Sequence, residues 1–243
     1  MSGAALPAGT SSPAVGTSEL PALAGVVFDM DGLLVDTEPL SYRAWVAHLA
    51  RDFGATLSEE DHAAMVGTDE LGSWTIARDR LGLAVDLPGG LAALRQAREA
   101  LYREVLAGGV TPMPGAVELA RACRDAGLRV GLASSSPMAQ ITTILAGLGL
   151  TGLFDALTSG EEVPASKPDP AIYALACARL GAAPAACVAL EDSRPGVLAA
   201  RAAGLRCLAV PNAYTAGHDL SAASAVVPSL VGVTPADLAA LPW

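Results

Sequence analysis

The chain has 243 residues and a formal charge of 15 − 25 = −10, with a pI near 4.7. Hydrophobic residues make up 52% and charged residues 16%, a composition typical of a globular protein with a substantial core. Because an acidic surface repels polyanions, we expect neither nucleic acid nor a membrane as a partner. An anionic ligand must then be held by a few local cations and backbone N–H groups.

The first 22 residues are rich in small and polar residues and lack the features of a signal peptide, which predicts a disordered tail on a cytoplasmic protein. The charge-free run 130–154 contains serines, threonines and glycines, so it predicts a strand, a turn and a helix rather than a membrane span. The cysteines form no CxxC pair and are expected to be buried thiols: Cys123, Cys177, Cys187 and Cys207.

The expected elements begin with a buried apolar strand at Val26 to Phe28. From about residue 37 to residue 111 the apolar residues recur at helical spacing, and no convincing strand is present. Short apolar strands then alternate with helices. Strands are expected at 128–133, 154–157, 186–190 and 205–210. Helices are expected at 115–126, 138–148, 169–180 and 195–203, each followed by a glycine as a stop signal.

Helices between apolar strands predict a parallel sheet that is covered on both faces. The strand at Val26 has the same character and should join that sheet. The sequence therefore predicts an α/β fold, with a Rossmann-like parallel sheet core and an inserted α-helical cap. The expected core comprises residues 23–36 and 113–243, and the expected cap comprises residues 37–112.

Carboxylates follow two of the expected strands. Asp29 and Asp31 come directly after the first strand, and Glu191 and Asp192 come after the strand at 186–190. Ligands of open parallel sheets bind at the carboxyl ends of the strands, so these residues should lie close together. Side chains and backbone carbonyls of such turns suit a hard cation such as Mg²⁺.

Phosphate-binding groups follow two other elements. Ser134, Ser135 and Ser136 stand just before a helix start, where helix N–H groups favour an anion, and Lys167 precedes another helix. Each piece alone is ordinarily a turn or a helix cap. Together they supply a metal site, phosphate-binding hydroxyls, one cation and a nucleophilic carboxylate, which predicts phosphoryl transfer through an aspartyl phosphate.

Four segments in this order resemble the motifs of the haloacid dehalogenase superfamily: FDMDGLLVDTEP, LASSS, SKPDP and LEDSRPGVLAARAAG. The resemblance covers roughly residues 23 to 236 and is to the phosphatase and β-phosphoglucomutase-like branch with a helical cap. It implies that Asp29 is the nucleophile and that Asp31 is the general acid and base, with its carbonyl on Mg²⁺. It also implies that Asp192 and Glu191 bind the metal, together with Asp29.

The same resemblance implies that Ser134 and Ser135 bind the phosphate, with Ser136 as a neighbour, and that Lys167 offsets the charge of the phosphoryl oxygens. Asp36 is expected to be a cap or hinge contact. We therefore expect a monomeric Mg²⁺-dependent phosphatase that hydrolyses a small phosphorylated metabolite, a sugar phosphate by resemblance.

Three other functions are less well supported by the sequence. GLGLTG, residues 147–152, matches the pattern of a dinucleotide-binding turn, but a helix precedes it and a strand follows, the reverse of the required context. An inactive descendant of the fold has no support, because every catalytic side chain is present. A sugar phosphate mutase needs a cap cation for a second phosphate, whereas residues 67–70 read GTDE and Ser41 replaces the histidine of such mutases. Another residue, Arg43 or Arg78 for instance, would have to supply that charge.

Overall fold

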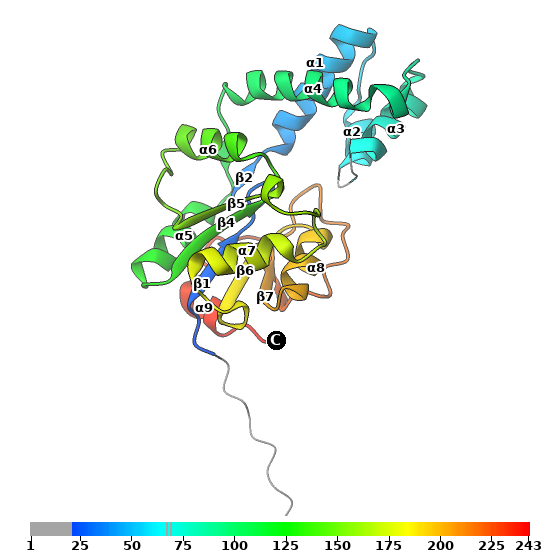
Figure 1. Cartoon of the computed structure of the whole chain (residues 1–243). Helices are drawn as coiled ribbons and strands as arrows, with labels where there is room; N and C mark the ends of the chain where they lie inside the picture. Colours follow the sequence, from blue (N-terminus) through cyan, green and yellow to red (C-terminus); the bar gives the residue numbers. More distant parts are fainter. Residues whose placement is uncertain (1–20, 67, 69) are drawn as a thin grey trace, which may run out of the picture.

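The computed structural model describes residues 21–66, 68 and 70–243 (Figure 1). Except for residues 21 and 22, the predicted tail lies outside the described residues. Six strands of the described chain form one sheet: β1 (Gly25–Phe28), β4 (Arg129–Ser134), β5 (Ala156–Ser159), β6 (Cys187–Glu191), β7 (Arg206–Ala209) and β8 (Ala225–Val226). Their order is β5-β4-β1-β6-β7-β8, and all neighbours are parallel. The predicted parallel sheet is confirmed.

Helices cover both faces of this sheet (Figure 1). They are α5 (Ala116–Asp125), α6 (Met138–Gly147), α7 (Ala171–Leu180), α8 (Arg194–Ala202) and α9 (Pro235–Ala239). Phe28 packs in the apolar cluster formed with α5, α6 and α9, whereas its neighbour Val27 packs in the cluster formed with α7 and α8. This alternation explains why the strands are apolar throughout, since both of their faces are buried.

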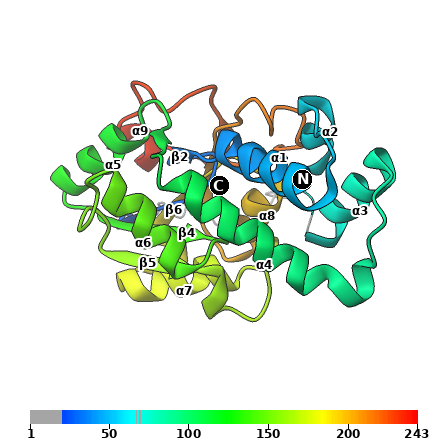
Figure 2. The same ribbon diagram turned by 90° about the horizontal axis from the view of Figure 1, so that it is seen from above.

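In the described part of the chain, four helices are inserted between β1 and β4 (Figures 1 and 2). They are α1 (Glu38–Phe53), α2 (Glu59–Met65), α3 (Glu70–Leu81) and α4 (Leu87–Leu106). The insertion has an apolar cluster of its own around Trp45 and Trp74, whose rings lie 4.7 Å apart. Leu40 and Leu106, at the two ends of the insertion, belong instead to the main cluster of the sheet. The predicted fold class, a parallel sheet with an inserted helical segment, is therefore confirmed.

A short antiparallel ribbon joins the insertion to the sheet. It consists of β2 (Val35–Asp36) and β3 (Thr111–Pro112), in which Asp36 is paired with Thr111. The Met113 N–H donates to the Leu34 carbonyl at 2.9 Å and extends the ribbon. The sequence did not reveal these strands, because two residues are too few to show a periodic pattern.

The other predicted elements agree with the structure to within about two residues, the usual margin for element ends. The 3-10 helices η1 (Gly160–Glu162) and η2 (Pro184–Ala186), together with β8 and α9, were not predicted. The GLGLTG segment lies between α6 and β5, in the reversed context that argued against a dinucleotide site. The four cysteines are free and buried. No helix among the described residues is both long enough and apolar enough to cross a lipid bilayer.

Candidate active site

Asp29 stands at the carboxyl end of β1, where its N–H continues the sheet by donating to the Leu190 carbonyl at 2.9 Å. Its carboxylate Oδ1 accepts a hydrogen bond from Lys167 Nζ at 2.5 Å. The same ammonium donates to Glu191 Oε1 at 2.6 Å. The side chains of Asp29 and Lys167 are each only 8% exposed, and that of Glu191 is fully buried. One cation therefore links the ends of two neighbouring strands.

The carboxylate of Glu191 is fully occupied by protein donors. Oε1 also accepts from the Tyr173 hydroxyl at 2.8 Å, and Oε2 accepts from the Ser193 hydroxyl at 3.0 Å. The backbone N–H groups of Asp192 and Ser193 reach Oε2 at 3.0 and 3.1 Å. A buried carboxylate is retained only when it is paired and hydrogen-bonded in this way. Glu191 thereby fixes the position of Lys167.

Asp192 is held in place by Asn212, in the loop after β7. The Asn212 side-chain amide donates to Asp192 Oδ2 at 2.9 Å and to the Gly32 carbonyl at 3.1 Å. Gly32 has a φ of +84°, and a Cβ at this position would lie 2.6 Å from Asp192 Oδ2. Only glycine fits this close approach without strain. Asn212 and Gly32 therefore join the loop after β1 to the end of β6.

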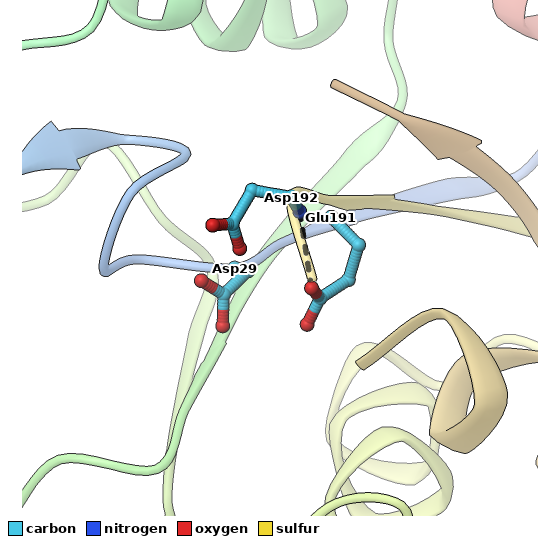
Figure 3. A group of neighbouring side chains, drawn as sticks. All are labelled: Asp29, Glu191 and Asp192. Carbon is cyan, nitrogen blue, oxygen red and sulfur yellow. Dashed lines mark hydrogen bonds between the residues drawn. The ribbon is translucent and has the colours of Figure 1, made fainter. Parts of the chain in front are cut away.

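Asp29, Glu191 and Asp192 form a buried group whose ligand oxygens lie within 4.8 Å of one another. The carboxylates of Asp29 and Asp192 approach each other, with Glu191 alongside (Figure 3). The hydrogen bonds from Lys167 and Asn212 go to the other oxygen of each carboxylate, and no residue of the described chain donates to Asp29 Oδ2 or Asp192 Oδ1. These two oxygens suit a hard divalent cation. Asp31, the fourth predicted metal ligand, does not contribute its carboxylate to this group.

The protonation tendencies of the group indicate a shortage of positive charge. Burial raises the pKa of Asp29 to about 8, although Lys167 opposes this shift. Burial, followed by the charges of Glu191 and Asp29, raises the pKa of Asp192 well above its usual range. Burial alone would raise the pKa of Glu191, but the charge of Lys167 and the hydrogen bonds from Lys167, Ser193 and Tyr173 together lower that pKa. A second cation beside Asp29 and Asp192 would favour their ionised forms, so the residues fit a divalent metal.

Asp31 faces the serines that follow β4. Its Oδ2 accepts hydrogen bonds from the Ser134 hydroxyl at 3.0 Å and the Ser136 hydroxyl at 2.9 Å. The Ser136 N–H in turn donates to Ser134 Oγ at 3.0 Å. Ser135 is exposed and lines the adjoining cavity. The structure therefore brings the predicted acid and the predicted phosphate-binding hydroxyls together, although they are about 100 residues apart in the chain.

A cavity of about 670 Å³ lies between the sheet and the insertion. From the sheet side it is lined by Asp31, Ser135, Ser136 and Lys167. From the insertion it is lined by, among others, Glu38, Glu70, Arg95, Arg98 and Glu99. Its volume falls within the usual range for small-molecule sites.

Several of these residues were missed from the sequence. Arg95 and Arg98 line the cavity, whereas Arg43 and Arg78, the arginines named from the sequence, do not. Arg43 is exposed, and Arg78 pairs with Asp79 at 2.7 Å. Only the packing of α4 decides which of its residues line the cavity, so the sequence alone did not identify Arg95 and Arg98. Residues 67 and 69 of the GTDE segment lie outside the described residues.

Comparisons with known proteins identify the family of this chain. A family model for haloacid dehalogenase-like hydrolases matches residues 23–204. Hexitol phosphatase B of Escherichia coli K12 is 38% identical over 197 residues, which cover 76% of this chain and 82% of that protein. The phosphorylated carbohydrates phosphatase of Thermotoga maritima is 32% identical over 202 residues, covering 83% and 91%.

A crystal structure of mutant CbbY from Rhodobacter sphaeroides in complex with xylulose-(1,5)bisphosphate is also similar. It has a TM-score of 0.77 and 27% identity, and the match covers 89% of this chain and 99% of that one. The chain therefore belongs to the haloacid dehalogenase-like hydrolases, in their phosphatase and β-phosphoglucomutase-like branch, and is a phosphoric monoester hydrolase.

Proposed function

We propose that the protein is a Mg²⁺-dependent phosphatase that hydrolyses a small phosphorylated sugar through an aspartyl phosphate on Asp29. The main observation is the contact between Asp29 and Lys167 beside a cavity that Asp31 and Ser135 also line. The substrate class is supported by two relatives whose names specify phosphatases of hexitols and of phosphorylated carbohydrates.

The residues divide the reaction into two displacements at phosphorus. In the first, Asp29 attacks the ester phosphorus, the bond to the sugar oxygen breaks, and Asp31 gives that oxygen a proton. In the second, Asp31 takes a proton from a water molecule, which attacks the phosphorus of the acyl phosphate. Phosphate leaves and the Asp29 carboxylate is restored. Ser134, Ser135 and Lys167 hold the phosphoryl oxygens during both steps.

Mg²⁺ would be held by the carboxylates of Asp29 and Asp192 and by the backbone carbonyl of Asp31. The Glu191 carboxylate, whose oxygens accept from protein donors, would lie beside the ion as part of the same acidic group. When bound, the ion would offset negative charge on the phosphoryl oxygens. Among the protein groups, Lys167 offsets the charge on Asp29 through its contact with Oδ1.

A screen of phosphorylated metabolites tests this function. The purified protein is incubated with each compound in Mg²⁺ and again after chelation, and free phosphate is measured. We expect turnover of sugar phosphates in Mg²⁺ only. Turnover that survives complete metal removal would contradict the proposed mechanism.

A sugar phosphate mutase of the β-phosphoglucomutase type is the second candidate, because Arg95 and Arg98 bring positive charge to the insertion side of the cavity. The assay is incubation with a hexose 1-phosphate and a trace of the bisphosphate, followed by product analysis. We expect free phosphate to form faster than isomerised sugar phosphate. The opposite order would favour the mutase.

A further inference from the structure

Arg98 and Glu70 form an ion pair that lines the cavity opposite the catalytic carboxylates. Arg98 Nη2 donates to Glu70 Oε2 at 2.7 Å, and the two side chains are only 20% and 25% exposed. Both residues line the cavity. An arginine in this place would be the natural partner of a second anionic group on the substrate, because its guanidinium matches phosphate and carboxylate geometry.

Tryptophans of the insertion hold this ion pair in position. Glu70 Oε1 accepts a hydrogen bond from Trp74 Nε1 at 3.1 Å, so both oxygens of the carboxylate are engaged. The Arg98 guanidinium lies 5.0 Å from the ring centre of Trp45, which itself packs against Trp74. The pair is therefore anchored in the apolar cluster of the insertion rather than being a loose surface contact.

The described residues of the insertion that line the cavity carry no excess of positive charge. Its charged lining residues are three carboxylates and two guanidiniums, a formal balance of 2 − 3 = −1: Glu38, Glu70, Glu99, Arg95 and Arg98. Arg98 already has a carboxylate partner, because its Nη2 donates to Glu70. Arg95 is exposed and forms no ion pair with the described residues, so it offers only a solvated cation.

We infer that Glu70 acts as an internal anion that occupies Arg98 and so selects substrates with a single phosphate and an uncharged far end. This inference rests on the proposed phosphatase function and specifies its substrate class. A second phosphate that approached Arg98 would meet the Glu70 carboxylate on the same guanidinium, and taking its place at Nη2 would leave a half-buried carboxylate without its cation. The hydroxyl groups of a sugar or polyol meet no such barrier, because they can bind beside the ion pair. Glu70 thus creates specificity by weakening the binding of a bisphosphate, not by strengthening the binding of a monophosphate.

The experiment compares two substrates that differ only in the second phosphate, fructose 1-phosphate and fructose 1,6-bisphosphate. Values of kcat/KM are measured for the wild type, Glu70→Gln and Glu99→Gln. The two variants remove the same charge from the same cavity, but only Glu70→Gln releases Arg98, and glutamine keeps an acceptor for Trp74. We expect the wild type to favour the monophosphate. Glu70→Gln should raise the ratio of bisphosphate to monophosphate kcat/KM by about tenfold or more, and Glu99→Gln by about twofold or less.

Glu70→Asp is the second variant, for use if the glutamine variant unfolds. It keeps the charge but loses reach to Arg98, so the ratio should move in the same direction. Equal changes in Glu70→Gln and Glu99→Gln would overturn the inference, as would a wild type that prefers the bisphosphate. Both of these results leave the phosphatase function standing. A wild type that hydrolyses no sugar phosphate would refute the function itself and the inference with it.

Discussion

Gly196, in the first turn of α8, lies directly against the carboxylate of Glu191, so that a Cβ at position 196 would overlap the side chain. The helix can approach the end of β6 this closely only because position 196 has no side chain. Glu191 in turn positions Lys167 at 2.6 Å.

Gly196→Ala should therefore displace Glu191 and destabilise the protein by about 1–3 kcal/mol or more, since overpacking a rigid core forces side chains out of their rotamers. Turnover should fall with it, because Lys167 loses a partner. Urea unfolding and kcat measure the two effects. Gly147→Ala is the control, because a Cβ there would meet no atom within 4 Å. Equal changes in unfolding free energy and kcat in the two variants would show that the close contact of Gly196 with Glu191 does not matter for stability or turnover.

Asp29→Asn should abolish turnover while preserving the fold. The amide is nearly the same shape but cannot form an acyl phosphate. Lys167 keeps its ion pair with Glu191 in the variant, so no buried charge loses its only partner. Phosphate release and thermal unfolding provide the two readouts. Substantial residual activity would show that Asp29 is not the nucleophile.

Asp31→Asn should lower kcat by about 10²–10⁴-fold, the usual contribution of a general acid and base. Asparagine keeps an oxygen that can accept from Ser134 and Ser136, so the local structure should remain. The matched control is Asp36→Asn, on the ribbon, which should retain nearly full turnover. An equal loss in both variants would assign the effect to the charge of this segment rather than to proton transfer.

Asn212→Ala should weaken metal binding by about 10–100-fold, the usual effect of removing a partner that orients a ligating carboxylate. The reason is that Asn212 donates to Asp192 and to the Gly32 carbonyl together. Calorimetric titration of the purified protein with Mn²⁺ measures the affinity directly. Tyr214→Phe, in the same loop, should bind Mn²⁺ as the wild type does. An unchanged Mn²⁺ affinity in Asn212→Ala would show that Asn212 does not contribute to metal binding.

Glu38 should make the stability of the protein depend on pH. Burial, then the charges of Asp31 and Asp36, raises its pKa from the usual 4.5 to about 7. Between these values the folded state holds a proton that the unfolded state has lost, so the free energy of unfolding falls as pH rises through this window. Relative to Glu38→Gln, the wild type should lose about 1–3 kcal/mol between pH 4.5 and 7.5. Urea denaturation at both pH values tests this, and a constant difference would refute it.

Much of the site could be predicted because its carboxylate and hydroxyl side chains follow directly after strands. The apolar run up to Phe28 places Asp29 at a sheet edge, and the run before Glu191 does the same for its carboxylate. The parallel order of the sheet then brings the two together. The sequence could not reveal Asn212, since its contact with the Gly32 carbonyl spans 180 residues and depends on the course of a loop.

The insertion was less predictable for a related reason. Helical periodicity locates α3 and α4 but does not say which turn of one meets which turn of the other. The Glu70 and Arg98 pair depends on that meeting, across 28 residues. Nothing in the local pattern around either residue distinguishes them from ordinary solvated charges.

The ribbon of β2 and β3 has a mechanical consequence. Both chain crossings between the sheet and the insertion run through one pair of hydrogen-bonded strands, extended by the bond from Met113 to Leu34. Neither crossing can twist without carrying the other. The paired strands therefore favour rotation of the insertion about the ribbon itself. Two separate, unpaired connections would permit rotation about several axes. A rotation of the insertion that keeps β2 and β3 paired must therefore carry both crossings together.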